Sequence, residues 1–256
     1  MDREKLRRVF DFTGRVVIVT GGTRGIGRAL AEGYAAAGAR VVVASRKPAA
    51  CKETEQHLQA MGGEALGVAT HLGDLGALRS LVERTVDAFG GIDVVVNNAA
   101  NALALPLGEY TPEAWAKSLD VNLRGPVFLV QEALPHLKRS RHAAVLNVLS
   151  GAAFLFSSTV SLYAIGKAGL MAATRSMAAE YERHGIRVNA LSPGTVDTDM
   201  VRHNPAEAQD RMTEIQIMKR MADPDEMVGP ALLLTSDAGS FITGHVLFAD
   251  GGMVPR

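Results

Sequence analysis

The chain has 256 residues, of which 47% are hydrophobic and 21% charged, and its 27 basic residues balance its 27 acidic ones. This composition is typical of a soluble globular protein, and the length fits one large α/β domain or two small ones. The balanced charge argues against a nucleic-acid-binding surface and against a polybasic membrane patch, so we expect neither partner.

Targeting and redox signals are sparse. The N-terminal stretch MDREKLRRVFDF has no apolar run long enough for a signal peptide, and its acidic residues argue against a transit peptide. We expect residues 1–11 to form a solvated extension. No stretch approaches about 18 uninterrupted apolar residues, so no membrane-spanning helix is expected. Cys51 is the only cysteine, which excludes an intramolecular disulfide and favours a cytoplasmic location.

Short β-branched runs alternate with longer helical patterns along the chain. The β-branched runs are nearly continuous apolar sequence, which is typical of parallel strands buried on both faces. They lie at residues 15–20, 39–45, 64–69, 92–97, 143–149, 186–192 and 245–250. Helical patterns occupy residues 25–37, 75–89, 113–138, 163–184 and 225–236. The alternation predicts one α/β domain over residues 12–256, a Rossmann-like, doubly wound parallel sheet of about seven strands with helices on both faces.

The stretch from 198 to 222 interrupts this alternation. It is rich in methionine, has no strand pattern and falls between the sixth and seventh predicted strands. We interpret it as a lid over a site at the carboxyl ends of the strands. The alternative is an inert pair of surface helices.

A glycine-rich loop, VTGGTRGIG (19–27), joins the first predicted strand to the first predicted helix. Its glycines would let the backbone turn sharply and approach a pyrophosphate, while the helix N-terminus offers free N–H groups to the phosphates. The spacing is G-x-x-x-G-x-G, which differs from the G-x-G-x-x-G of the standard dinucleotide fingerprint. Its place after the first strand of a βαβ unit indicates a dinucleotide-binding loop.

The end of the second predicted strand bears on which dinucleotide is bound. NAD-preferring enzymes usually place an acidic residue here to hold the ribose 2′-OH. This chain instead has Ser45, Arg46 and Lys47, with no carboxylate. Arg24 in the glycine loop adds another cation, and converging arginines favour a 2′-phosphate by charge and by bidentate hydrogen bonds. We therefore expect NADP(H) rather than NAD(H), the alternative being that Arg46 and Lys47 form only a solvated loop.

Seven motifs, in order and at compatible spacings, resemble those of the short-chain dehydrogenase/reductase family. They are the glycine loop, NNAA (97–100), DVNLRG (120–125), Ser150, YAIGK (163–167), SPGTVDTDM (192–200) and ITGHVLFADGG (242–252). The match runs from about residue 12 to the C-terminus. The resemblance implies an NAD(P)(H)-dependent oxidoreductase that interconverts a ketone or aldehyde and an alcohol.

The resemblance also implies four catalytic residues. Tyr163 and Lys167 match the family's Y-x-x-x-K pair, and residues four apart share one face of a helix. A lysine cation one turn away, together with the positive charge of the oxidised nicotinamide, would lower the phenol pKa from about 10, which suits Tyr163 to act as general acid/base near neutral pH. Ser150 would hold the carbonyl oxygen beside the tyrosine. Asn122 is implied to bend the long helix and to order a water in a proton relay from Lys167.

Cofactor contacts follow from the same resemblance. Lys167 is implied to bind the nicotinamide ribose, and the Val196 backbone and Thr198 hydroxyl to meet the carboxamide. Asn97 is implied to steady the sheet, and Ala100 departs from the family's usual glycine. The predicted cofactor-contacting residues are Gly21, Thr23, Arg24, Gly25, Ile26, Gly27, Ser45, Arg46, Leu72, Asn98, Ala99, Tyr163, Lys167, Pro193, Gly194, Val196 and Thr198.

The adenine site shows a second departure from the family pattern. His71 stands where family members commonly have an aspartate that contacts adenine. The Leu72 backbone can still serve that contact, and we interpret Asp74 as a helix cap. None of the seven histidines has partners spaced like a metal site, so no metal is expected.

Apolar residues near the predicted catalytic groups indicate a fairly apolar small-molecule substrate. They are Leu103, Leu105, Phe154, Leu155, Phe156 and Met200. The alternative is that the aromatic residues pack at a subunit interface, and the resemblance implies a homotetramer. Two other functions stay open: a 3-oxoacyl thioester (acyl-carrier-protein) reductase, with Arg124, Arg175 and Arg202 as the only basic docking residues, and a non-catalytic NADP(H)-binding sensor or scaffold.

Overall fold

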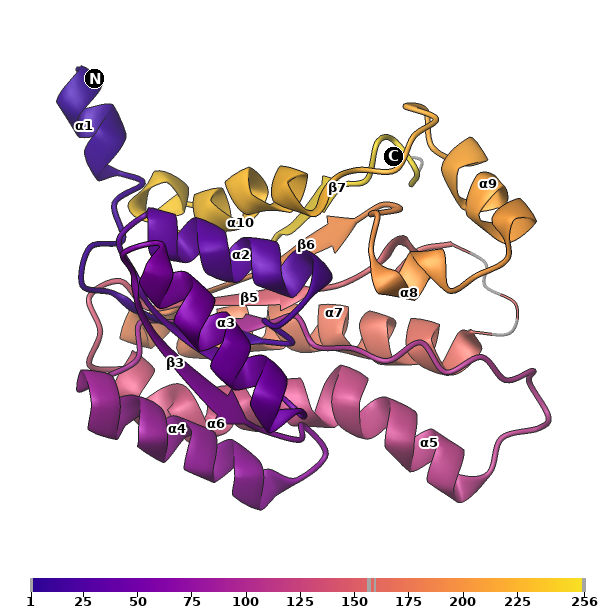
Figure 1. The fold of residues 1–256 in the computed structure, drawn as a ribbon, viewed down its shortest axis with the longest axis horizontal. Coiled ribbons are helices and arrows are strands. Elements are labelled where there is room, and N and C mark those ends of the chain that lie inside the picture. Colours follow the sequence, from indigo (N-terminus) through magenta and orange to yellow (C-terminus); the bar gives the residue numbers. More distant parts are fainter. Residues whose placement is uncertain (1, 156–157, 159, 255–256) are drawn as a thin grey trace.

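The computed structural model describes residues 2–155, 158 and 160–254, and this part of the chain forms a single seven-stranded parallel sheet (Figure 1). The strand order is β3-β2-β1-β4-β5-β6-β7. The bounds are β1 (Val16–Thr20), β2 (Arg40–Ser45), β3 (Glu64–Ala69), β4 (Val94–Asn97), β5 (Ala144–Val148), β6 (Arg187–Pro193) and β7 (Val246–Ala249). Each predicted strand is therefore found, and the predicted doubly wound fold is confirmed.

Helices cover both faces of the sheet. Figure 1 shows α2, α3 and α10 over one face, and α4, α6 and α7 over the other. The helices are α1 (Arg3–Arg8), α2 (Gly25–Ala36), α3 (Pro48–Ala60), α4 (Leu75–Phe89), α5 (Pro112–Leu119), α6 (Gly125–Leu137), α7 (Ser161–Tyr181), α8 (Asp199–Arg202), α9 (Ala206–Glu214) and α10 (Val228–Thr235). None of those within the described residues has the length and apolarity that a membrane crossing requires.

The central strands owe their stability to burial on both faces. Every residue of β1 and β5 is buried. In β1, Val17 and Val19 pack with α2 and α10, whereas Ile18 packs into the opposite core with Leu129 and Val130 of α6. Full burial of such a side chain contributes roughly 1.5–3 kcal/mol, so these strands stabilise both core layers.

The strand order reverses direction between β1 and β4, which lie side by side in the sheet. The chain leaves β1 toward β2 and returns to β4 on its other side. Crossovers that diverge in this way leave a crevice above the carboxyl ends of the two strands, where ligands bind in open α/β sheets. The glycine loop after β1 lies at this crevice.

One predicted helix is not continuous. The pattern at 113–138 predicted a single long helix, but the structure forms α5 and α6 with a five-residue π-turn, η1 (Asp120–Arg124), between them. The helix α3 was not anticipated from the sequence. Its buried positions are Cys51, Thr54, Glu55 and Leu58, which have helical spacing but include polar residues.

The 198–222 segment contains α8 and α9, and its two ends, which form its base, are held together. Val196 and Ala222 form a parallel β-bridge, in which Asp197 N donates to Ala222 O at 2.9 Å. Inside the base, buried Gln216 accepts from Thr195 N at 2.6 Å. The segment is therefore an excursion from the sheet whose two ends are tied together.

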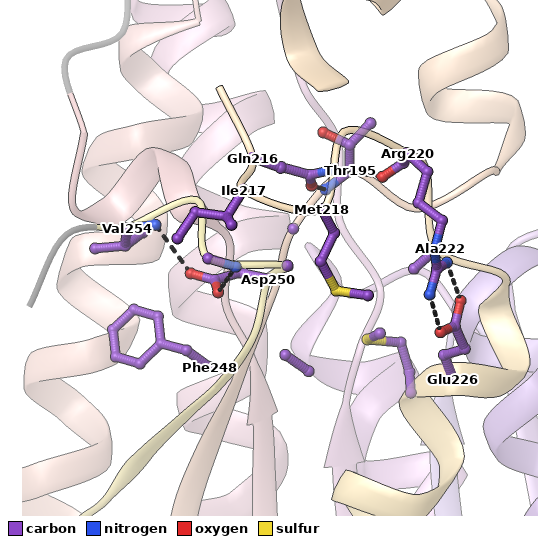
Figure 2. Close-up of a pocket in the computed structure, with 15 residues that line it drawn as sticks. Thr195, Gln216, Ile217, Met218, Arg220, Ala222, Glu226, Phe248, Asp250 and Val254 are labelled. Carbon is purple, nitrogen blue, oxygen red and sulfur yellow. Dashed lines mark hydrogen bonds and ion pairs between the residues drawn. The ribbon is translucent and has the colours of Figure 1, made fainter. Parts of the chain in front are cut away.

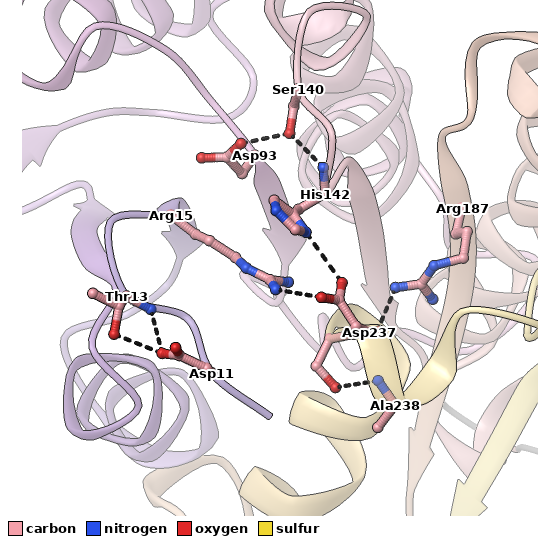
Figure 3. A network of polar contacts seen from close by, with 10 residues as sticks. Asp11, Thr13, Arg15, Asp93, Ser140, His142, Arg187, Asp237 and Ala238 are labelled. Atoms are coloured by element: carbon pink, nitrogen blue, oxygen red, sulfur yellow. Dashed lines mark hydrogen bonds and ion pairs between the residues drawn. The ribbon is translucent and has the colours of Figure 1, made fainter. Parts of the chain in front are cut away.

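A polar network joins elements at the opposite, amino-terminal edge of the sheet. Figure 3 shows Asp237 between Arg15, His142 and Arg187. Asp237 accepts from Arg15 Nη2 at 2.8 Å and contacts His142 Nδ1 at 3.1 Å. Burial alone would raise the Asp237 pKa, but the hydrogen bonds from His142 and Arg15 outweigh it and hold the pKa below its ordinary value. The network thus ties the start of β1 and the start of β5 to the end of α10.

Candidate active site

The glycine loop is a tight backbone cradle. Gly21 and Gly25 have φ values of +66° and +51°, which side-chain-bearing residues rarely adopt. A Cβ on Gly27 would lie 2.2 Å from Gly21 O, so only glycine fits there. Arg24, which precedes α2, makes no side-chain cap. The N–H groups of the first turn are consequently free of side-chain partners, which suits the binding of a phosphate. This loop fits the pyrophosphate of a dinucleotide.

The end of β2 lies beside the glycine loop and carries free cations. Thr23 Oγ1 donates to Ser45 Oγ at 3.2 Å, which fixes the loop against the strand end. Arg46 and Lys47 are exposed, and neither forms an ion pair within the described residues. The structure therefore brings the predicted 2′-phosphate residues to one place.

The strand β3 ends where the adenine site was predicted. His71 is exposed, and its Nδ1 accepts from Gly73 N at 3.0 Å. Leu72 is buried. Asp74 caps α4 by accepting from Gly76 N at 2.8 Å, which confirms the predicted helix cap.

The end of β4 packs directly on the glycine loop. Asn98 Nδ2 donates to Thr20 O at 2.9 Å, and a Cβ on Gly21 would lie 2.9 Å from Ala99 Cα. Asn97 Nδ2 donates to Asn147 Oδ1 of β5 at 2.9 Å, so this side chain does link the two central strands. Asn98 and Ala99 border the crevice at the switch point.

Three of the predicted catalytic side chains meet at the start of α7. Tyr163 and Ser150 are joined by a side-chain hydrogen bond. Lys167 is 1% exposed, with Nζ 5.6 Å from the centre of the Tyr163 ring. Its Nζ donates to Val148 O at 2.6 Å. A hydroxyl pair with an amine beneath it can hold a carbonyl oxygen and exchange a proton with it.

The predicted lowering of the Tyr163 pKa relies on Lys167 together with a bound oxidised cofactor, and Lys167 does not produce it in the chain alone. Burial raises the pKa of Tyr163, and the hydrogen bond from Ser150 offsets this only in part. Burial also lowers the pKa of Lys167 to about 7. An amine that is so weakly protonated, and that faces the Val148 carbonyl, gives the phenol little positive charge.

Asn122 lies inside the π-turn and is completely buried. Its Nδ2 donates to Asn101 O at 2.8 Å, and its Oδ1 accepts from Asn101 N at 3.1 Å. Asn101 also uses its own carboxamide, whose Nδ2 donates to Lys117 O at 2.8 Å. Sequence reasoning passed over Asn101, although a further carboxamide directly after NNAA was the available signal.

The π-turn packs closely on α7, the helix that carries Tyr163 and Lys167. A Cβ on Gly166 would lie only 2.8 Å from Asn122 Cβ. Gly166 stands between Tyr163 and Lys167 in α7, so the helix that carries the tyrosine and the lysine lies directly against the asparagine. All four predicted catalytic residues are thereby assembled in one region.

The end of β6 leads the chain across the glycine loop. Thr198 Oγ1 donates to Val196 O at 3.3 Å, and a Cβ on Gly25 would lie 3.0 Å from Thr198 Cγ2. Pro193, the last residue of β6, is buried. A Cβ on the following residue, Gly194, would lie 2.5 Å from Gln216 Oε1. Thr198 therefore lies against the glycine loop, whereas Gly194 packs on Gln216 of the 198–222 segment.

The predicted apolar substrate residues surround the site only loosely. Phe154 stacks on Phe248 with ring centres 4.8 Å apart, and Met200 is 44% exposed. Leu103, Leu105 and Leu155 are partly buried, and Phe156 lies outside the described residues.

A cavity of about 670 Å³ opens beside the ends of β6 and β7. Figure 2 shows the Arg220–Glu226 ion pair on one side of it and Phe248 on the other. Neither Ser150 nor Tyr163 lines this cavity, so it is separate from the catalytic groups. No group of metal-ligating side chains is found among the residues that the structure describes.

Known proteins resemble this chain over nearly its whole length. The family profile described as enoyl-(acyl carrier protein) reductase matches residues 21–254. An L-rhamnose 1-dehydrogenase (NAD(P)(+)) of Azotobacter vinelandii is 36% identical over 246 residues, which cover 93% of this chain and 96% of that protein. A 2,5-dichloro-2,5-cyclohexadiene-1,4-diol dehydrogenase of Sphingobium indicum is 37% identical, with 94% and 98% covered.

Solved structures also resemble this chain over nearly its whole length. A putative NAD(P)-dependent gluconate 5-dehydrogenase from Beutenbergia cavernae, solved with bound NADP at low occupancy, is 34% identical with a TM-score of 0.90. The alignment covers 96% of this chain and 98% of that one. A putative short-chain alcohol dehydrogenase from Sinorhizobium meliloti is also 34% identical, with a TM-score of 0.91 and 96% and 98% covered. Sequence motifs, fold and relatives agree, and the chain belongs to the short-chain dehydrogenase/reductase family as an NAD(P)-dependent oxidoreductase acting on alcohol and carbonyl groups.

Proposed function

We propose that this oxidoreductase prefers NADP(H) and interconverts a fairly apolar ketone or aldehyde with its alcohol. The observation that carries the proposal is the Ser150–Tyr163 hydroxyl pair above buried Lys167, at the crevice that holds the glycine loop. The nicotinamide would supply or accept the hydride. The remaining chemistry is the transfer of a proton to or from the oxygen and the stabilisation of the negative charge that develops there. These side chains are suited to both tasks.

In the reducing direction, hydride arrives at the carbonyl carbon and negative charge develops on the oxygen. Ser150 Oγ and Tyr163 Oη would both donate hydrogen bonds to this oxygen, and Tyr163 would then transfer its proton to it. A raised pKa keeps Tyr163 protonated before the transfer. Lys167 beneath the ring would return a proton to the phenolate, with Asn122 positioned beside α7. Oxidation of the alcohol reverses these steps.

The preference for NADP(H) rests on three cations. Arg46 and Lys47 follow β2, where no acidic residue stands to bind a 2′-hydroxyl, and Arg24 is next to Thr23, whose hydroxyl donates to Ser45 at the end of that strand. A 2′-phosphate carries up to two negative charges, so these side chains would bind it by charge and hydrogen bonding.

Neither alternative function gains support from the site. Docking of an acidic carrier protein would need a cluster of free basic residues, yet Arg124 pairs with Asp120 and Arg202 pairs with Asp197, which leaves only exposed Arg175 of the three without an ion pair among the described residues. A non-catalytic sensor would need a damaged site, but Asn122, Ser150, Tyr163 and Lys167 are all present. Reduction of a ketone or aldehyde therefore remains the proposal.

Three further features complete the proposal. The 198–222 segment would act as a lid, because its first residues cross the glycine loop. A homotetramer would pair the helices at 113–138 and 163–184, where Trp115 is 45% and Ile165 40% exposed, with those of a second copy, and would pack the C-terminal segments together. Cys51 is free and buried, which suits a reducing, cytoplasmic location.

The test compares wild-type protein with Tyr163→Phe. NADPH and NADH oxidation would be followed with a panel of ketones, aldehydes and cyclic ketones. We expect turnover to fall by about 10²–10⁴-fold in Tyr163→Phe, because the proton donor is lost. Cofactor binding, measured by fluorescence, should stay within about threefold, because the phenol hydroxyl is not its main anchor. Retained turnover would remove Tyr163 as the acid.

A further inference from the structure

The glycine loop and the 198–222 segment touch at two points, although they are far apart in the chain. The methyl carbon of Thr198 packs over Gly25, and Arg24 Nη1 lies 3.4 Å from Asp199 Oδ2. Figure 1 shows α8, which begins at Asp199, next to the beginning of α2. The Arg24–Asp199 pair therefore spans the crevice in which the dinucleotide would lie.

The cations around the end of β2 are not equivalent. Arg46 and Lys47 have no ion-pair partner among the described residues, whereas Arg24 has Asp199. Both members of that pair are accessible, with 71% of the Arg24 side chain and 47% of the Asp199 side chain exposed. Arg24 can therefore turn either toward Asp199 or toward the end of β2, but one guanidinium cannot serve both directions fully.

We propose that Asp199 is a specificity-determining residue, which competes with the 2′-phosphate for Arg24 and so weakens the preference for NADP(H). The inference rests on the proposed role of Arg24 in binding that phosphate. NAD(H) has no 2′-phosphate, so it leaves the Arg24–Asp199 pair in place. NADP(H) must draw Arg24 away from Asp199, and part of the free energy of phosphate binding is lost in breaking the pair.

The magnitude follows from the exposure of the pair. Ion pairs between accessible side chains contribute about 0.2–1 kcal/mol, which corresponds to about a 1.4- to fivefold change in relative affinity. The competition therefore tunes cofactor preference and does not reverse it. Because the pair is exposed, salt screens it, and the tuning weakens as ionic strength rises.

The experiment measures dissociation constants of NADP⁺ and NAD⁺ by calorimetry, with no substrate added. In Asp199→Asn, we expect NADP⁺ to bind about 1.4- to fivefold more tightly relative to NAD⁺, because Arg24 is freed for the phosphate. Asp197→Asn is the matched control. It removes the same charge two residues away, but Asp197 pairs with Arg202 rather than with Arg24. The ratio of the NADP⁺ and NAD⁺ dissociation constants should therefore be the same in Asp197→Asn as in the wild type.

A double-mutant cycle separates this inference from the proposed function. Arg24→Met should lower NADP⁺ affinity relative to NAD⁺, and adding Asp199→Asn to it should change the ratio no further. An unchanged ratio in Asp199→Asn, an equal shift in Asp197→Asn, or a shift that persists without Arg24 would overturn the inference. If Arg24→Met leaves the ratio unchanged, the proposed phosphate contact of Arg24 fails, and this inference fails with it.

Discussion

Lys167 shows how strongly one buried side chain depends on its surroundings. Its amine is 1% exposed and donates to a backbone carbonyl, and no carboxylate forms an ion pair with it in the described part of the chain. Burial disfavours the charged form and lowers the pKa to about 7. An amine that titrates near neutral pH can both release and accept a proton under physiological conditions, which suits the role proposed for it beside Tyr163.

The lowered pKa has a consequence for stability. Between about pH 7 and about pH 10, the unfolded chain binds a proton at Lys167 that the folded chain lacks, so this residue makes stability rise with pH. We expect the wild type to gain stability relative to Lys167→Met between these two values. Urea denaturation of both proteins without cofactor would measure it. Cys51 and the other groups that titrate in this range are present in both proteins, so their effects cancel in the comparison. A difference in unfolding free energy that does not change with pH would contradict the prediction.

The contact between α7 and the π-turn is the element-scale feature on which the site depends. Asn122 reaches the site because the turn is widened by one residue and because Gly166 lets α7 approach closely. Neither element alone determines the position of the asparagine. A substitution at the contact should therefore affect both stability and catalysis.

We expect Gly166→Ala to destabilise the protein. Alanine would gain up to about 1 kcal/mol of helix propensity, but its Cβ would overlap Asn122 Cβ, and such overpacking costs typically about 1–3 kcal/mol. Turnover should fall as well, because Asn122 must move. Gly169→Ala is the matched control in the same helix. Its Cβ would meet only the flexible end of Leu123, so unchanged or higher stability is expected. Thermal unfolding of both variants checks this, and equal losses would refute it.

At the scale of the whole molecule, the two edges of the sheet have different roles. The carboxyl edge carries the glycine loop and the proposed catalytic groups. The amino edge carries the network of Arg15, His142 and Asp237 that joins three elements. Substitutions at the amino edge should change stability and leave catalysis unaltered.

Asp237→Asn tests this division. The variant leaves the largely buried Arg15 without its carboxylate, and we expect a loss of about 1–3 kcal/mol of unfolding free energy at neutral pH. Because the folded pKa of Asp237 is lowered, its stabilisation exists above the unfolded pKa of about 4 and is lost as pH falls below it. Urea denaturation should therefore show the two proteins converging in acid. Asp87→Asn, at an exposed position on α4, serves as the control, and a change in KM for Asp237→Asn would argue against the division.

Sequence reasoning predicted the sheet well because the strand signal is local. Runs such as VVIV are apolar wherever they occur, so each strand was found. The helix α3 was missed because polar Thr54 and Glu55 occupy two of its buried positions. The π-turn and the Arg24–Asp199 pair were not predictable, because each depends on a contact between segments that the fold brings together. The catalytic residues were named through motifs, whereas the pKa directions required knowledge of burial.

The closure of the 198–222 segment has an evolutionary consequence. Val196 and Ala222 pair at its base, so the segment leaves and rejoins the sheet at nearly the same point. A doubling of such a loop costs only about 0.6 kcal/mol of closure entropy. Insertions, deletions or replacements in its outer part, after Asp199 and before Gln216, can therefore accumulate without disturbing the strands. With the proposed lid role, changes in this stretch would alter substrate selection while the sheet and the proposed catalytic groups stay the same.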